Sequence, residues 1–589
     1  MMVKKYINIG LFCCLAMFAE GCGTQEDLQS DQNISQVEQI EQNSSVSYRV
    51  AAQELTITTA SSVLNKAAYV SSQCYTKTVD ENNVAHNPCF SCHINSEEPN
   101  YIDDPDLQES YAFSEYTVTN RWTNLFKDRT QQVANITDDA ILSYVRQSNY
   151  FDENNSIVLN EILASVPNEW DYNSDGIWSG YKPDCYFNFD GEGFDQTPQN
   201  SYTGWRAFAY YPFLGTFWPT NGSMDDVLIR LPKVMREDKN GAFDLNVYKI
   251  NLAVVESLIK KNPVKIESVD ETIYGVDLNN NGVLDVADEV AYNWVAPKYD
   301  FATKKYTNFS MHYVGAAKEA LIENTLHIAP GLYPEGTEFL HSVRYMDVQD
   351  NNSLTMAPRM KELRYSKKTA WNTYPELNNA TKAEIKEKEA FPDRLRTISG
   401  DAEHGLRNGL GWIYQGFIED KKGYLRPQTY EETLFCIGCH SGIGATVDSS
   451  FVFSRKLDEA QGVKSWYHWS QKALEGIKEP KLSDGRYEYE LYLQANGAGD
   501  EFRDNDELQE KFFDINGSLK SEEMQKVRND ISYLLIPSID RALELNKAYK
   551  VIVEEQSFIY GRDAHIKPVE NVHKEVEALT PTKVTVIRK

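Results

Sequence analysis

The sequence predicts an α+β fold that is rich in loops and organised around two similar cysteine-histidine boxes. Strand-like runs recur through the middle of the 589-residue chain, separated by stretches rich in Asn, Asp and Gly. Residues 521–555 instead carry apolar side chains at three- and four-residue spacing, which is typical of helices. The boxes have the pattern Cys-x-x-Cys-His and stand at residues 89–93 and 436–440. We therefore expect one lobe around each box, a mixed region between them and a helical C-terminal segment.

The N-terminus resembles an export signal followed by a lipid-attachment site. Two lysines precede an apolar core at residues 6–19, which is shorter than the ~20 apolar residues of a membrane span. Gly21 before Cys22 is similar to a bacterial lipobox, in which Glu20 departs from the usual small or apolar residue. We predict a signal peptide at 1–21 and a lipid anchor on Cys22; the alternative is simple cleavage. The mature protein is expected to be periplasmic or at the cell surface, held to a bacterial membrane by the anchor only.

The rest of the chain divides by composition. Residues 22–48 are mostly Gln, Ser, Asn and acidic residues, which bury too little apolar surface to offset chain entropy, so they predict a flexible tether. The regions expected after it are a first box region at 49–130, an Asn/Asp/aromatic-rich region at 131–300, a mixed region at 301–430 and a second box region with a helical C-terminus at 431–589.

Local patterns give some elements within these regions. Strand-like alternation interrupted by loops is expected at residues 339–348, 354–371 and 401–417. Pro537 is expected to divide the helical stretch 521–555 into two helices, because proline cannot donate the backbone hydrogen bond of a helix interior.

Composition and charge exclude one broad class of partner. Charged residues make up 25% of the chain and apolar residues 41%, which is ordinary for a folded protein. The net charge of -28 leaves little basic surface to replace the counterions of a phosphate backbone. We therefore expect no nucleic acid among the partners.

The two boxes carry the strongest chemical signal. With nine Cys and ten His in the chain, chance predicts roughly 0.002 such boxes. Two thiols three positions apart can each add across one vinyl group of a porphyrin, and the adjacent histidine can then ligate the iron. The residues that would bind haem in this way are Cys89, Cys92, His93, Cys436, Cys439 and His440, with His93 and His440 as iron ligands.

Zinc and disulfide chemistry are the alternatives for these cysteines. Two Cys-x-x-Cys pairs can supply the four thiolates of a zinc site, but zinc needs no histidine after each pair. The pairs also stand 347 positions apart (436 minus 89). A redox-active cysteine pair usually opens a helix after a strand and occurs once.

On these two boxes and the export signal, the chain resembles the c-type cytochromes, with two haem sites. The resemblance is at the level of the family, and no motif beyond the boxes selects di-haem peroxidases or rubber oxygenases, which are also large and exported. It implies two covalently attached haem c groups, one in each lobe. It also agrees with the export signal, because this family attaches haem outside the cytoplasm.

The resemblance implies electron transfer between redox partner proteins, or with a small-molecule electron donor or acceptor, outside the cytoplasm. Two alternatives stay open, so whether the protein is an enzyme is not decided by the sequence. One is a haem-dependent oxidoreductase, peroxidase- or oxygenase-like, with one open-faced catalytic haem whose catalytic residues are unknown. The other is an extracellular binding protein with structural haem. A second strong iron ligand favours electron transfer; the candidates are His312, His327, His341, His404, His468, His565, His573, Met356 and Met360.

A twelve-residue stretch, "DLNNNGVLDVAD", matches a calcium-binding loop. Its expected ligands are Asp277, Asn279, Asn281, Val283 (through its carbonyl), Asp285 and Asp288, with Gly282 at the sharp turn. The preceding "ETIYGV" does not look helical, and the alternative is a hairpin turn without metal. A second stretch begins similarly at Asp171, but Lys182 occupies its twelfth position, so that Asp184 would have to replace it.

Two further cysteines predict a disulfide. Outside the signal region and the boxes, Cys74 and Cys185 remain as an even pair. Because an exported protein folds in an oxidising compartment, we expect them to be joined.

Overall fold

The computed structural model describes residues 63–76, 78–79, 85–86, 89–94, 97–100, 109–214, 221–457, 464–496 and 505–582. These residues belong to one compact unit. The predicted signal peptide, lipid-anchor cysteine and tether lie outside them. Within the described part of the chain, no helix combines the length and the apolar character that a membrane crossing requires.

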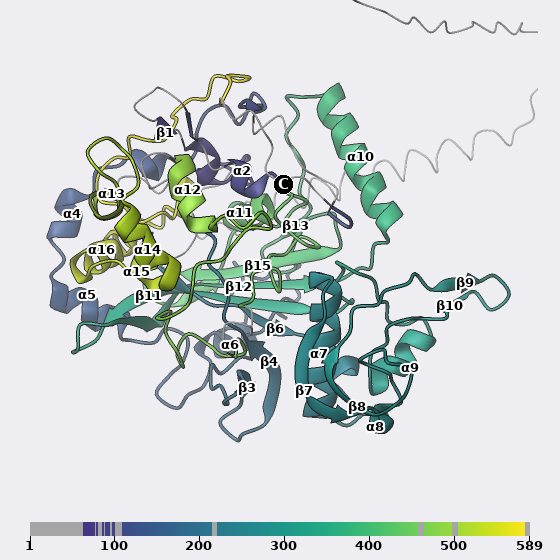
Figure 1. Ribbon diagram of the computed structural model, residues 1–589. Helices are drawn as coiled ribbons and strands as arrows, with labels where there is room; N and C mark the ends of the chain where they lie inside the picture. Colours follow the sequence, from purple (N-terminus) through teal and green to yellow (C-terminus); the bar gives the residue numbers. More distant parts are fainter. Residues whose placement is uncertain are drawn as a thin grey trace, which may run out of the picture. The chain divides into compact units, whose positions relative to one another are not determined.

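An antiparallel sheet occupies the centre of this unit (Figure 1). Its main path runs β13-β14-β15-β12-β11-β6-β4-β3, with β16 paired to β15 and β5 paired to β11. The strands are β3 (Phe194–Gln196), β4 (Tyr202–Ala207), β5 (Met224–Asp225), β6 (Leu228–Arg230), β11 (Glu338–Val348), β12 (Leu354–Lys368), β13 (Gly400–Asp401), β14 (Gly405–Arg407), β15 (Trp412–Glu419) and β16 (Leu425–Pro427).

The long hairpin β11–β12 explains how one strand tolerates a proline in the middle of a sheet. The register shifts between the pairs Arg344–Met360 and Met346–Met356. Pro358 lies on β12 within this irregular stretch. Because a bulge leaves a residue outside the ladder, the missing N–H of proline costs no hydrogen bond there. Strands expected at 339–348, 354–371 and 401–417 are thus present, and the α+β class is confirmed.

Side chains cover both faces of the sheet. On one face, Phe339 and Trp412 join the largest hydrophobic cluster. On the other face, Leu340, Leu363 and Phe417 belong to a separate cluster, which they form with buried side chains of residues 150–185. Successive residues of a strand point to opposite faces of the sheet. Because both faces are covered here, nearly every residue of β11 and β15 is buried, and the alternation of polar and apolar residues is lost.

Helices surround the sheet. They are α2 (Cys89–Cys92), α4 (Thr130–Ala134), α5 (Asp138–Val145), α6 (Val158–Ala164), α7 (Leu245–Lys260), α8 (Glu271–Tyr274), α9 (Ala316–Ile322), α10 (Tyr374–Ala390), α11 (Tyr430–Cys439), α12 (Glu488–Asn496), α13 (Asp506–Phe512), α14 (Ser521–Asn529), α15 (Ser532–Leu535) and α16 (Ile539–Glu555), with 3-10 turns at Ser72–Tyr75, Thr123–Phe126, Lys233–Arg236 and Phe558–Tyr560. Helix α11 packs on β14 and β15, and α5 and α16 pack on β11. Pro537 separates α14 and α15 from α16, as predicted.

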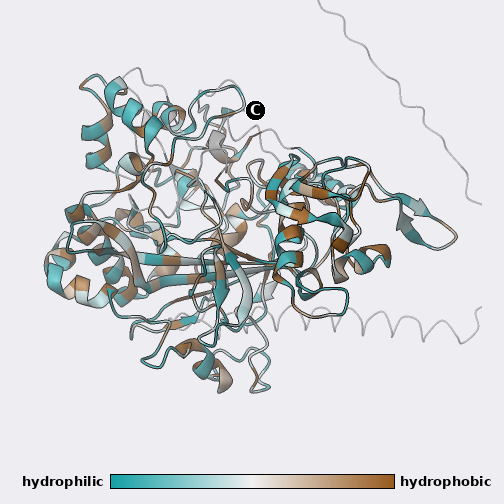
Figure 2. Ribbon diagram, turned by 60° about the horizontal axis from the view of Figure 1, so that its bottom comes forward, coloured by the Kyte–Doolittle hydropathy of each residue, from teal (hydrophilic) through white to brown (hydrophobic). Residues whose placement is uncertain are grey.

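Two small sheets lie beside α7 and α9 (Figure 1). One pairs β7 (Val264–Asp270) with β8 (Val286–Val290), and the other pairs β9 (Lys298–Asp300) with β10 (Lys305–Thr307). The β9–β10 hairpin projects from its neighbours, and its turn is more hydrophobic than its two strands (Figure 2). A fourth sheet pairs β1 (Thr78–Val79) with β2 (Ala85–His86).

The C-terminal segment returns to the region of the first box. Isolated bridges join Thr76 to Val572, Thr119 to Glu575 and Ser110 to Pro581. The described ends of the chain are therefore packed together around the first box.

Candidate functional site

The second box closes helix α11. Thr429 caps the helix: its hydroxyl accepts from the amide of Glu432, whose carboxylate accepts from the amide of Thr429. Glu432 also pairs with Arg426 at 2.8 Å, and both side chains are buried. The His440 amide donates to the carbonyl of Cys436 at 2.9 Å. The capped helix therefore fixes Cys436, Cys439 and His440 on the same surface, at the spacing i, i+3, i+4.

These three residues line a cavity of about 240 Å³. Its walls come from β11, β12 and β15 of the sheet, from α11, and from the loops near residues 208–214 and 443–455. The aromatic residues among its lining are Phe208, Tyr210, Tyr211, Phe213, Phe339, Tyr365, Trp412, Tyr414, Phe435, Phe451 and Tyr492. A mostly apolar cavity that is rich in aromatic side chains and carries a few polar groups is typical of a cofactor site.

His440 has the arrangement of a metal-ligating histidine. Its Nδ1–H donates to the carbonyl of Ser449 at 3.0 Å, which leaves Nε2 as the ring nitrogen that can ligate. The ring stacks on Tyr414 with centroids 5.2 Å apart. Burial lowers the pKa of His440 to about 4, so the imidazole is neutral at physiological pH, as a ligand must be.

His341, on β11, lines the same cavity and is arranged in the same way. Its Nδ1–H donates to the backbone carbonyl of Asp226 at 2.5 Å, and its Nε2 lies 3.4 Å from the Asp225 carboxylate. Burial, assisted by the positive charge of Arg364, lowers the pKa of His341 to about 4. Among the described residues that line the cavity, His341 is the one that the sequence had named as a possible second ligand.

The cavity also holds polar residues that sequence reasoning missed. Asp225, at the end of β5, accepts a hydrogen bond from the Tyr210 hydroxyl at 2.5 Å. Burial raises the pKa of Asp225 well above its usual range, so that this carboxyl tends to be protonated. No local sequence pattern marks Asp225 or Tyr210. The chain has 87 acidic residues and 35 tyrosines, and only the fold brings these two to the cavity.

Arg364, which also lines the cavity, supplies a fixed positive charge. It pairs with Glu362 at 2.9 Å, and Arg562 pairs with the same carboxylate at 2.6 Å. The two guanidinium groups hold the pKa of Glu362 at about 2 despite burial, so Glu362 is ionised. One buried carboxylate thus faces two arginines beside the cavity.

The first box lies against the second. Helix α2 carries Cys89 and Cys92, and the His93 amide donates to the carbonyl of Cys89 at 2.8 Å. Cys92 lines the same cavity as the second box. The Ala445 amide donates to the Cys92 carbonyl at 3.0 Å. The fold thus brings together two boxes that are 347 positions apart in the sequence.

The thiols of the second box lie in surroundings that disfavour their charged form. The thiols of Cys436 and Cys439 are unpaired, lie at the cavity wall and have a pKa that burial raises, to about 12 for Cys439. Because zinc takes thiolates, the raised pKa of these thiols disfavours zinc binding by the pair. Among the described residues, no group of three or more His, Cys, Asp or Glu is arranged to hold a metal ion.

The other sequence-predicted iron ligands lie elsewhere. His404 pairs with Asp401 at 2.9 Å, His468 pairs with Asp226 at 2.9 Å, and His327 pairs with Glu335. His312 contacts the carbonyl of Phe309 through Nε2. The remaining candidates, His565, His573, Met356 and Met360, are also absent from the described lining of the cavity.

The predicted disulfide is not formed. Both thiols are unpaired: the Cys74 sulfur contacts the hydroxyl of Ser71, whereas Cys185 is buried in the cluster on the opposite face of the sheet. Ser71 lines the cavity, so the sheet separates the surroundings of the two cysteines. An even number of cysteines says nothing about distance, and this is why the prediction was wrong.

The loop at 277–288 gathers most of its predicted ligands. The Asp277 carboxylate accepts from the amides of Asn281 and Gly282, and Asp285 contacts the side-chain amides of Asn279 and Asn281. Asp288 instead lies on β8 with its side chain 71% exposed and pairs with Lys265 at 3.8 Å.

Two further features of this loop differ from expectation or were missed. The segment "ETIYGV" contains the helical turn α8, contrary to the prediction. Buried Glu271 was missed: its carboxylate accepts from the amides of Leu278, Asn279 and Asp285 and so holds the loop from inside. The carbonyl of Val283 stays a predicted ligand.

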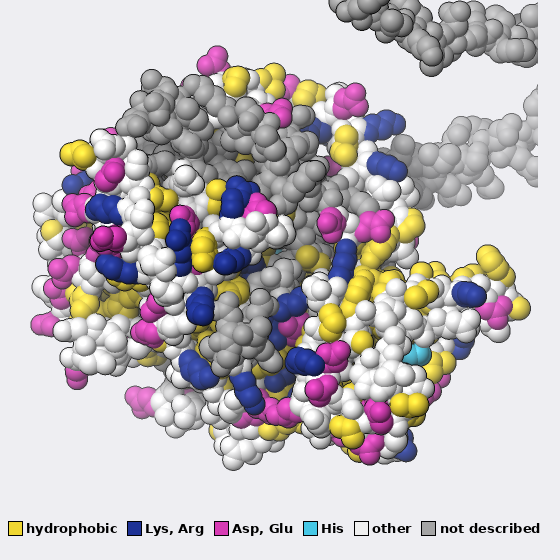
Figure 3. Space-filling model, viewed as in Figure 1, with side chains coloured by type: hydrophobic (Ala, Val, Ile, Leu, Met, Phe, Trp, Pro, Cys, Tyr) yellow, Lys and Arg dark blue, Asp and Glu magenta, His cyan; other side chains and the backbone are white. Residues whose placement is uncertain are grey.

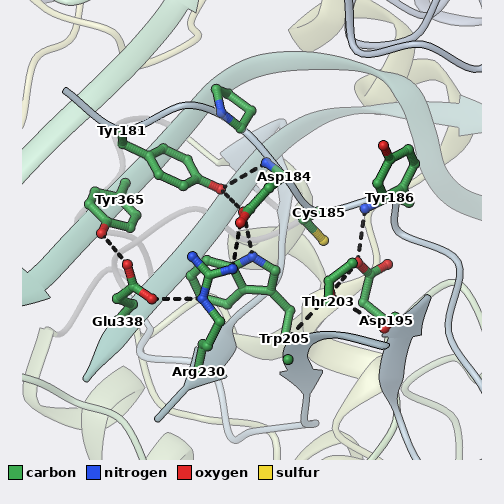
Figure 4. A network of polar contacts seen from close by, with 12 residues as sticks. Tyr181, Asp184, Cys185, Tyr186, Asp195, Thr203, Trp205, Arg230, Glu338 and Tyr365 are labelled. Atoms are coloured by element: carbon green, nitrogen blue, oxygen red, sulfur yellow. Dashed lines mark hydrogen bonds and ion pairs between the residues drawn. The ribbon is translucent and has the colours of Figure 1, made fainter. Parts of the chain in front are cut away.

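The second calcium-like stretch loses its substitute ligand. Asp184 is bound by Arg230 at 2.5 Å, by the indole of Trp205 at 2.8 Å and by the hydroxyl of Tyr181 at 3.0 Å (Figure 4). Arg230 also pairs with Glu338 at 2.6 Å, which anchors this network on the sheet. Asp184 therefore stabilises the fold instead of completing the loop that starts at Asp171.

Comparison with known proteins relates the chain to lipoproteins. A family model described as "-like lipoprotein" matches residues 58–533. An "Uncharacterized lipoprotein" of Aquifex aeolicus (strain VF5) is similar to this chain, with 31% identity over 548 residues that cover 84% of this chain and 85% of the relative. No solved structure gives a significant match.

Proposed function

Because the chain belongs to this lipoprotein family and is therefore an exported, lipid-anchored protein, we propose that it is a di-haem c-type cytochrome that transfers electrons between redox partners outside the cytoplasm. Covalent haem attachment needs an exported chain, and the family membership supplies that condition. Within the exported space, the anchor would hold the protein at a bacterial membrane, on the periplasmic or the outer surface.

The observation that carries the proposal is the pair of histidines in one cavity. His440 and His341 each donate from Nδ1 to a backbone carbonyl, at 3.0 and 2.5 Å, and both line the cavity. Such a hydrogen bond fixes the tautomer in which Nε2 is the ring nitrogen that can ligate a metal. On His341 this nitrogen also lies 3.4 Å from the Asp225 carboxylate. Two strong ligands leave no position for a substrate, which favours electron transfer over activation of a bound molecule.

The chain's own residues have defined roles in this proposal. Cys436 and Cys439 would form the thioether bonds, His440 would ligate from the side of α11, and His341 would ligate from β11. Haem supplies one-electron chemistry when bound, and its potential depends on ligands, burial and nearby charge. Arg364 would neutralise an anionic propionate at the cavity edge.

The first box supports passage of electrons within the chain. Cys89, Cys92 and His93 would hold the first haem, and Cys92 is shared between the wall of the cavity and this box. The segment after the second box is hydrogen-bonded to the first box, from the Ala445 amide to the Cys92 carbonyl. Both sites therefore belong to one packed core.

The test is the spin state of the haem-loaded protein. Electron paramagnetic resonance on the oxidised wild-type chain, with covalent haem counted per chain, is expected to give two low-spin haems. His341→Leu is expected to convert one of them to high spin without loss of covalent haem. His404→Leu, which removes a half-exposed histidine outside the cavity, is the matched control and should leave both low-spin. Absence of covalent haem, or an unchanged spectrum for His341→Leu, would contradict the proposal.

A second candidate function rests on Asp225. This buried carboxyl, hydrogen-bonded to Tyr210 and 3.4 Å from His341, is an acid placed in the cavity where a proton could be delivered. A haem-dependent oxidoreductase would need such a group beside an open iron face. One high-spin haem in the wild-type protein, with peroxide turnover that Asp225→Asn lowers at least tenfold, would favour this function over electron transfer.

A further inference from the structure

The β9–β10 hairpin presents an aromatic cluster to solvent. Tyr299 pairs with Tyr306 across the two strands, and Phe301 lies at the turn. The ring of Tyr299 contacts both others, with centroids 5.1 Å from Phe301 and 5.2 Å from Tyr306. Phe301 is 86% exposed, Tyr299 42% and Tyr306 39%. Burying such surface in water-free surroundings is favourable, so an exposed aromatic cluster of this kind marks an interaction site.

The same hairpin is basic, although the chain as a whole is strongly acidic. Lys298, Lys304 and Lys305 are exposed, and within the described residues no carboxylate forms an ion pair with them. The one acidic residue of the hairpin, Asp300, caps the turn by accepting from the Ala302 amide and the Thr303 hydroxyl. Hydrophobic and basic side chains thus gather on the projecting hairpin (Figure 3).

The hairpin is held in place from its base. The Tyr306 amide donates to the side chain of Asn324 at 2.5 Å, just after α9, and the Thr307 hydroxyl donates to the carbonyl of Lys298. The aromatic cluster is therefore presented on an ordered support, and binding would cost little conformational entropy.

We propose that the β9–β10 hairpin is a membrane-contact site that inserts Phe301, Tyr299 and Tyr306 into the interfacial region of an anionic phospholipid bilayer. Aromatic side chains with a polar edge favour the headgroup level, and neighbouring lysines are attracted to anionic headgroups. The mixture of both on one projecting hairpin fits a bilayer surface better than an apolar protein groove.

The lipid anchor of this family is the reason to expect a bilayer as the partner of the hairpin. A lipid-anchored chain is always near a membrane, and a flexible segment of the length predicted for the tether, residues 22–48, would have a root-mean-square span of about 30 Å. The hairpin would thus meet the bilayer at a high effective concentration, so that even weak insertion orients the body. This second contact goes beyond the sequence-based expectation that the lipid anchor alone touches the membrane, and it does not depend on haem.

The experiment is flotation with lipid vesicles of the chain from residue 23 onward, which lacks the anchor and keeps every described residue. Vesicles of phosphatidylglycerol with phosphatidylethanolamine are compared with vesicles of phosphatidylcholine. We expect binding to the anionic vesicles, a reduction of about tenfold in Phe301→Asp, and a similar reduction in the triple variant Lys298→Glu, Lys304→Glu, Lys305→Glu.

The matched control is Phe391→Asp, which places the same charge at another exposed aromatic residue, 55% exposed after α10. It should bind vesicles like the parent chain. Thermal unfolding of each variant checks that the fold is kept, which is expected because all these positions are on the surface. The proposal is overturned if the parent chain binds neither vesicle type, which would leave a protein as the occupant, or if Phe301→Asp binds as tightly as Phe391→Asp.

Discussion

The backbone amide of Ala445 donates to the carbonyl of Cys92 at 3.0 Å, and this bond joins the two cysteine-histidine boxes. The backbone segments of the two box regions also approach each other closely at two glycines. A Cβ atom at Gly444 would lie 2.0 Å from the carbonyl oxygen of Ile94, and one at Gly438, between the two cysteines of the second box, would lie 1.8 Å from the carbonyl oxygen of Tyr69. Glycine is thus required at these two positions, one in the second box and one just after it, because any Cβ would overlap the opposing backbone.

Replacing either glycine is expected to separate the boxes. Gly444→Ala should lower the free energy of unfolding by about 1–3 kcal/mol, because the opposing atom is backbone and cannot move aside. Urea unfolding measures the change. Gly191→Ala is the control, since nothing lies within 4 Å of a Cβ there. Equal stability of Gly444→Ala and Gly191→Ala would show that the two boxes do not pack as described.

The ion pair under helix α11 gives a second prediction. Arg426 and Glu432 are 1% and 0% exposed as side chains. Arg426→Leu leaves a buried carboxylate without its partner and is expected to cost about 3–5 kcal/mol of stability. The exposed pair Lys526–Glu523 serves for comparison, because Lys526→Ala should cost less than about 1 kcal/mol. If the two losses were similar in denaturant titrations, the buried pair would not be what holds α11.

Lys361 makes stability depend on pH in the alkaline range. Its ammonium is buried, donates to Ser223 at 2.9 Å, and lies 4.3 Å from the ring centroid of Tyr549. Burial lowers its pKa to about 7 from 10.5. Between these values the unfolded chain binds more protons than the folded one, so the free energy of unfolding should rise as pH increases from about 7 to 10.5.

Lys361→Met isolates this effect. The difference in unfolding free energy between the parent chain and the variant should shift in favour of the parent by up to about 5 kcal/mol over that pH range. Chemical denaturation at several pH values measures it. A difference that stays constant with pH would mean that Lys361 keeps an ordinary pKa.

Part of this architecture could be predicted from the sequence, because some elements depend only on residues that are close together in the chain. The α16 start after Pro537 follows from proline's missing N–H, and the strands at 339–348 and 354–368 follow from their apolar pattern. The cysteine-histidine spacing itself identified the residues of the cavity that lie on α11.

The rest depends on pairing between distant strands. The sequence offered nine possible second ligands. Only the sheet, which pairs β11 with β12 and β12 with β15, brings His341 into the cavity with His440. Asp225 enters by its pairing with Val343 of β11, a contact between residues far apart in the chain. Cys74 and Cys185 illustrate the opposite error, since counting residues cannot reveal that a sheet lies between them.

The calcium loop yields the last prediction. Asp277 accepts from the backbone amides of Asn281 and Gly282, and Asp285 accepts from the side-chain amides of Asn279 and Asn281. Glu271 holds the loop backbone from inside. If Ca²⁺ binds there, millimolar Ca²⁺ should raise the melting temperature, because a ligand at 100 times its Kd stabilises the folded state by about 2.7 kcal/mol. Asp285→Asn removes a ligand charge and should abolish most of the shift. Asp288→Asn tests the twelfth position: its side chain points to Lys265, so the Ca²⁺ effect should survive. Calorimetry with Ca²⁺ and with chelator distinguishes the outcomes, and a melting temperature indifferent to Ca²⁺ would identify the loop as a hairpin turn without metal.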